Sequence, residues 1–228
     1  MFKTKTPSFT WLTTALAFLA AVIYCSWPLG YVLNPRVSDS GGLASELGAI
    51  GQPYNWVFIV GDVIAGVLIM IITGMLLKKM LKRQTWLVAV LVCYALFGLF
   101  TLIDALLPMS CDPSIAKVCP SIAHDPLLIV HGMASILASV FLFLSALFVW
   151  WQFRATPAAW FTSTIMVGYV VFGVASFIFF FVPGPGSLSQ HYYITLCSLW
   201  AVALPVILLN MRKSTPRATR WAFSRATK

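Results

Sequence analysis

Long apolar runs alternate with short polar segments along most of the chain. Each run is roughly 18 to 26 residues long, the length that an α-helix needs to cross a hydrocarbon core of about 30 Å. The pattern predicts an all-α fold, an integral membrane bundle of six transmembrane helices. The expected spans are residues 10–27, 56–77, 86–107, 126–151, 159–182 and 191–211, with a basic tail at 212–228.

The residues between the runs are those that end and start helices. Pro108 follows the third run, and Asp125 with Pro126 predicts an N-cap and a first helical residue for the fourth. The segment 34–55 is too polar and glycine-rich to span, and we expect only a short surface helix at 45–50. These breaks leave one helical bundle and no room for a separate soluble domain.

The first run could instead be a signal peptide, because it follows a basic N-terminus. The run ends in Tyr24-Cys25-Ser26-Trp27-Pro28, which lacks the small residues of a cleavage site. We therefore expect an uncleaved first helix.

Composition supports a membrane protein, because 60% of the residues are hydrophobic and only 9% are charged, whereas soluble domains carry roughly 25% charged residues. If the N-terminus is inside, all of the 15 Lys and Arg residues fall on the inner side apart from two, Arg36 and Lys117, which fall on the outer side. The six acidic residues and the three histidines fall on the outer side. This asymmetry predicts that both termini are cytoplasmic. The net charge of +9 then faces anionic lipid headgroups rather than a nucleic acid.

The chain has five cysteines, of which Cys111 and Cys119 lie eight residues apart in the expected outer loop. An oxidising compartment favours a disulfide between them. A redox-active pair is the alternative, although the spacing is not Cys-x-x-Cys. The other three, which lie in apolar runs, are expected to be packing residues.

Three ionisable residues on three helices share one depth. By helical rise, Asp62 lies roughly 9 Å and His131 roughly 8 Å below the outer helix ends, and Asp104 lies about one turn from its own outer end. Ionisable groups inside a span are costly and mark functional sites. Asp62, Asp104 and His131 are therefore the candidate catalytic residues. Glycines that would let helices approach closely there are Gly61, Gly66 and Gly132.

Several chemistries are open to this cluster. An aspartate beside a histidine makes a general base, histidines with a carboxylate could hold zinc, and Ser135, one turn from His131, could be a nucleophile. Alternatively, Asp62 and His131 bond each other and only lock two helices together. The candidate binding residues on the same side are Glu46, Asn55, His124, Ser135 and His191.

The polar motifs on the outer side resemble those of an uncharacterised bacterial family of six-helix membrane proteins, a domain of unknown function. The residues that carry the likeness are Ser45-Glu46-Leu47-Gly48, Gly51 to Trp56, Gly61-Asp62, Ala65-Gly66, Asp104, Leu107-Pro108-Met109, Cys111, Cys119, His124, His131 and Ser135. The resemblance implies a fold and a membrane location but no activity. A fainter likeness links the Ser, Asp and His set to membrane-embedded zinc hydrolases of lipid amides. The chain departs from those in having six expected spans instead of seven and no His-x-x-x-His in its last helix.

Two classes of function follow. The first is a membrane-embedded hydrolase or transferase that acts on a lipid or small amphiphile from the outer leaflet. The second is a non-enzymatic carrier, binding or assembly protein that uses the same outward-facing pocket.

Overall fold

The computed structural model of the chain describes residues 7–39, 42–80, 85–111, 125–154, 156–181 and 186–210. Six spans in this part of the chain are long and apolar enough to cross a membrane, which confirms the expected bundle. The long helices are α1 (Pro7–Tyr24), α4 (Asn55–Met80), α5 (Thr85–Leu106), α6 (Pro126–Phe153), α7 (Pro157–Phe181) and α8 (Gly186–Asn210). The short ones are η1 (Trp27–Leu29), α2 (Gly30–Leu33), α3 (Pro35–Asp39) and η2 (Ala44–Gly48).

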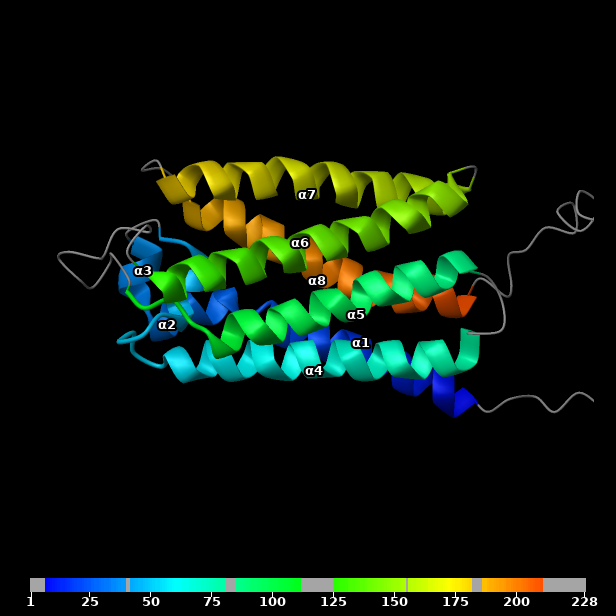
Figure 1. Cartoon of the computed structure of the whole chain (residues 1–228), viewed down its shortest axis with the longest axis horizontal. Coiled ribbons are helices and arrows are strands. Elements are labelled where there is room, and N and C mark those ends of the chain that lie inside the picture. The colour runs from blue at the N-terminus through cyan, green and yellow to red at the C-terminus, as the bar shows by residue number, and fades with distance from the viewer. Residues whose placement is uncertain are drawn as a thin grey trace, which may run out of the picture.

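The long helices run roughly antiparallel to their neighbours in the bundle (Figure 1). Each packs mainly on two others, in the closed order α1, α4, α5, α6, α7, α8 and back to α1. At one end, α1, α5 and α7 end while α4, α6 and α8 begin, and the short helices lie there (Figure 1). We call this the capped end.

The core between the long helices is mostly aliphatic and aromatic, and several of its buried polar groups form hydrogen bonds between helices. Tyr94 on α5 donates its hydroxyl to the carbonyl of Ala201 on α8 at 2.7 Å. The indole N–H of Trp200 on α8 donates to Ser145 Oγ on α6 at 2.8 Å. Hydrogen bonds of this kind between helices hold a membrane bundle in register.

Glycines bring α4 and α5 into backbone contact. A Cβ atom at Gly66 would lie 2.7 Å from the carbonyl oxygen of Gly98, and one at Gly98 would lie 2.9 Å from that of Gly66. The expected close approach at Gly66 is present, and Gly98 is its partner. At Gly61 a Cβ would make only ordinary contacts with Ile23. The expectation for Gly132 is wrong, because nothing lies within 4 Å of the place where its Cβ would be.

Several helices differ from expectation in their bounds or type. α1 ends at Tyr24 rather than near residue 27, because Pro28 has no N–H to bond the Tyr24 carbonyl. α8 begins at Gly186, five residues before the expected start at 191, since the polar residues that open it still form a helical turn. The expected surface helix at 45–50 is instead the 3₁₀ helix η2.

The start of α6 is as the sequence predicts. Asp125 has extended backbone geometry, and its Oδ1 accepts hydrogen bonds from the backbone N–H groups of Leu127 at 3.1 Å and Leu128 at 3.2 Å. Pro126 is the first helical residue, where no N–H is needed.

Candidate functional site

A partly enclosed cavity of about 110 Å³ lies inside the bundle near the capped end. All six long helices and η2 contribute to its wall. A single water needs about 10 to 15 Å³ of such space, so the cavity has room for several waters or a small polar group. Another cavity among the described residues holds only about 10 Å³ between apolar side chains.

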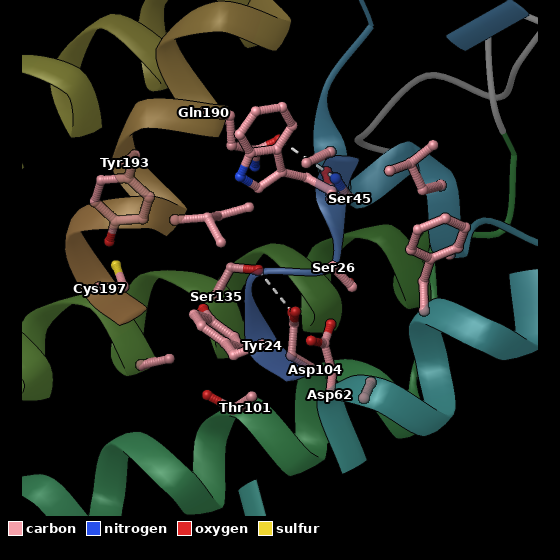
Figure 2. Close-up of a pocket in the computed structure, with 18 of the residues that line it drawn as sticks. Tyr24, Ser26, Ser45, Asp62, Thr101, Asp104, Ser135, Gln190, Tyr193 and Cys197 are labelled. Atoms are coloured by element: carbon pink, nitrogen blue, oxygen red, sulfur yellow. Dashed lines mark hydrogen bonds between the residues drawn. The ribbon is translucent and has the colours of Figure 1, made fainter. Parts of the chain in front are cut away.

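Asp104 on α5 joins two residues of α6 at the cavity wall. Ser135 donates its hydroxyl to Asp104 Oδ1 at 2.6 Å (Figure 2). His131 Nδ1 lies 3.1 Å from the same oxygen and 3.1 Å from the carbonyl oxygen of Leu107. The last carbonyl groups of a helix lack partners within that helix, so His131 also ties the end of α5 to α6.

Asp62 on α4 faces the same cavity (Figure 2). Its carboxylate is close enough to Asp104 for the two charges to interact. Among the described residues, none donates a hydrogen bond to Asp62. The interpretation in which Asp62 and His131 bond each other is wrong. Among the described residues, the His131 ring contacts Asp104 and the backbone carbonyl of Leu107 instead.

Thr101 is a cavity residue that the sequence did not single out. It lies one turn before Asp104 on α5, and its side chain lines the cavity (Figure 2). The residue is only 4% exposed, and its hydroxyl oxygen has no hydrogen-bond partner among the described residues. The spacing of three residues from Asp104 was the available signal, since it places both on one helix face.

The wall deeper in the bundle is formed by hydroxyl groups of α6, α7 and α8. Tyr169 donates to the carbonyl of Ser139 at 2.7 Å. The Tyr193 hydroxyl lies 2.5 Å from that of Tyr169 and also bonds Ser139 Oγ. Cys197 lies beside Tyr193 in the same wall (Figure 2). These residues were also missed, because a tyrosine or serine in an apolar run has no distinctive pattern.

The η2 segment covers the cavity at the capped end. Ser45 N–H donates to Oε1 of Gln190 on α8 at 3.3 Å, and Ile50 N–H donates to the carbonyl of Met109 at 2.8 Å. Both Ser45 and Gln190 line the cavity. Hydrogen bonds therefore join the cap to α8 and to the end of α5.

Of the five expected binding residues, only Ser135 lines the cavity among those described. Asn55 holds the loop before α4 by donating to the carbonyl of Ala49 at 3.2 Å. His191 is buried and stacks on Trp27, with ring centroids 4.2 Å apart. Glu46 is on η2 but does not line the cavity. His124 lies outside the described residues, so its role as a binding residue stays a prediction. Cys119 also lies outside them, so its disulfide with Cys111 stays a prediction.

The residues that the structure describes do not fit a zinc site. Zinc in proteins has three or four His, Cys, Asp or Glu ligands, and no group of three such residues in the described part of the chain could hold a metal ion. Asp104 and His131 alone are too few.

The Asp125 carboxylate, at the start of α6, accepts hydrogen bonds from side-chain and backbone groups. Ser110 at the end of the α5 segment donates its hydroxyl to Asp125 Oδ2. This bond, with those from the backbone N–H groups of Leu128 and Leu127, lowers the pKa of the Asp125 carboxyl. The carboxylate therefore links the two chain segments that lead into and out of the loop between α5 and α6.

Comparison with known proteins places the chain in a family without assigning it an activity. No curated protein matches the sequence, and no solved structure does. A family described as "Protein of unknown function (DUF998)" matches residues 14–209, most of the chain and every long helix of the bundle. The chain therefore belongs to this family.

Proposed function

We propose that this protein binds a lipid or small amphiphile in the bacterial inner membrane, with the ligand's polar group in the cavity and its apolar part among the helices. The observation that carries the proposal is the cavity itself, a polar space of about 110 Å³ within an otherwise apolar bundle. Ligand sites are commonly concave, mostly apolar, and carry a few polar groups that fix the ligand.

The side from which the ligand enters follows from charge. The basic residues that the sequence places near the opposite end of the bundle favour a cytoplasmic location for that end. The capped end then faces the periplasm, and the cavity is reached from the outer leaflet. The basic cytoplasmic face would meet anionic lipid headgroups.

Binding fits the geometry better than hydrolysis or group transfer does. A nucleophilic serine is activated by a base that takes its proton, most often an imidazole. Here the Ser135 hydroxyl donates a hydrogen bond to Asp104 instead, and the contacts of the His131 ring are with Asp104 and a backbone carbonyl, not with Ser135. The enzymatic alternative would therefore need Asp104 as the base.

Native mass spectrometry of protein released from its own membranes tests the binding proposal. The variant Ala138→Leu adds volume at a residue that lines the cavity, and we expect it to lose a bound amphiphile that the wild type retains. Ala105→Leu is a second variant of the same kind, in case the first does not fold. Gly132→Leu on α6 is the matched control, because open space surrounds it.

An identical set of bound lipids in all four proteins would refute a ligand site in the cavity. Labelling by a serine-directed fluorophosphonate addresses the enzymatic alternative. Attachment at Ser135 that depends on Asp104 would favour catalysis, and its absence in folded protein would favour binding.

A further inference from the structure

We infer that the cavity recognises a primary ammonium group, held by Asp62, Asp104 and Thr101. The inference rests on the proposed function and names the chemical class of its ligand. Its evidence is the charge of the cavity wall and the hydrogen-bonding groups that have no partner there.

The ionisable side chains of the cavity wall are mainly acidic. Asp62 and Asp104 contribute two carboxylates, while no Lys or Arg among the described residues lines the cavity. Among the described residues of the cavity wall, His131 is the one that can carry a positive charge. Of the two carboxyl groups, it contacts that of Asp104 and not that of Asp62. A carboxylate inside a membrane-spanning segment is costly unless it is paired. A cationic ligand group beside Asp62 would remove that cost.

Thr101 is a second, independent observation that points to a ligand. Some threonines in the long helices bond a carbonyl one turn back, as Thr13 does with Phe9 and Thr73 with Ile69, each at 2.8 Å. Thr101 lines the cavity and is 4% exposed, and its hydroxyl bonds no described residue. A buried hydroxyl without a partner is costly, so a ligand atom that bonds it is favoured.

The number of acceptors fits an ammonium group. A primary ammonium carries three N–H donors. The cavity wall offers the side-chain oxygens of Asp62, Asp104 and Thr101, from α4 and α5, as acceptors, and the carboxyl groups of Asp62 and Asp104 lie side by side (Figure 2). Calcium takes six to eight oxygen ligands, more than these three side chains supply. A quaternary ammonium has no N–H and could not donate a hydrogen bond to any of these acceptors.

Isothermal titration of the purified protein in phosphatidylcholine nanodiscs tests the inference, because that lipid has no primary amine. Hexylamine, protonated at about pH 7, is compared with hexyltrimethylammonium and hexanol. We expect hexylamine to bind at least about tenfold more tightly than either, since hydrogen bonds to charged groups are the stronger kind.

Substitutions identify the acceptors. We expect Asp62→Asn to weaken hexylamine binding at least about tenfold and Thr101→Val several-fold. Thr73→Val on α4 is the matched control and should bind as the wild type does, because Thr73 bonds its own helix. Thr101→Val keeps all charges, so it stays informative if Asp62→Asn does not fold.

The failures of the two proposals are distinguishable. Equal binding of hexylamine and hexyltrimethylammonium, both lost in Ala138→Leu, would overturn the ammonium inference and leave the cavity as a binding site. Hexylamine binding that Ala138→Leu does not change would overturn both. Binding that survives Asp62→Asn and Thr101→Val would overturn the assignment of these acceptors.

Discussion

Ser135 on α6 donates its hydroxyl proton to Oδ1 of Asp104 on α5 across 2.6 Å. The direction of this bond makes Ser135 a donor that fixes the carboxylate, and it joins two neighbouring helices beside the cavity. His131 holds the same oxygen from one turn away on α6. Asp104 is thus positioned by α6, whereas none of the described residues donates a hydrogen bond to Asp62 in the same cavity wall.

Replacing Ser135 by alanine should lower the free energy of unfolding by about 1 kcal/mol, the usual size of an interhelical hydrogen bond in a membrane protein. Unfolding in mixed micelles measures this change. Ser198→Ala is the control, because Ser198 bonds the carbonyl of Ile194 in its own helix. A double-mutant cycle with Asp104→Asn should show coupling, and strictly additive effects would contradict the bond.

Gly66→Ala should destabilise the bundle by about 1 to 3 kcal/mol, the usual cost of overpacking. The new Cβ would lie 2.7 Å from the Gly98 carbonyl oxygen, and neither backbone can move without separating α4 from α5. Gly132→Ala should instead leave stability unchanged or raise it by up to about 1 kcal/mol, because a glycine in open space only weakens its helix. Thermal unfolding of the two variants gives the comparison, and equal changes would contradict the close approach.

The bundle was predictable from sequence because the membrane imposes a fixed length on each apolar run. The N-cap at Asp125 was predictable because aspartate before proline has a local meaning at a helix start. The short helices after α1 were not, since their positions depend on packing at the capped end. There Val37, Leu47 and Phe58 form a small apolar cluster of their own.

The sequence predicted only how far from the helix ends the residues of the candidate site lie. Helical rise placed Asp62, Asp104 and His131 at one level, and the structure brings all three to the cavity. Rotation about each helix axis is set by packing, so the sequence did not distinguish which pair would bond. For the same reason the sequence left Thr101 and Tyr193 among ordinary helix residues.

Stability should fall in acid through Asp125. The pKa of this carboxyl is lowered in the folded state, first by the Ser110 hydrogen bond and then by the N–H groups at the start of α6. The ionised Asp125 carboxylate therefore stabilises the fold fully at pH values above about 3.9, the ordinary pKa of an aspartate in the unfolded chain. This stabilisation is lost as the pH falls from there toward the lower pKa of Asp125 in the folded protein. Melting temperatures of the wild type and Asp125→Asn should differ at pH 6 and converge below about pH 4. A constant difference across this range would contradict the assignment.

The membrane orientation is the prediction on which the direction of ligand entry depends. Lys and Arg near helix ends are retained in the cytoplasm during insertion, and Lys78 and Lys79 lie in the last turn of α4, at the end opposite the cap. In a chain without its native cysteines, Ile50→Cys should react with an impermeant maleimide in intact cells, because Ile50 is 52% exposed at the capped end. Lys78→Cys should react only after the cells are opened. The reverse pattern would place the cavity on the cytoplasmic side, and the ligand would then come from the inner leaflet, with its contacts to Asp62 and Thr101 unchanged.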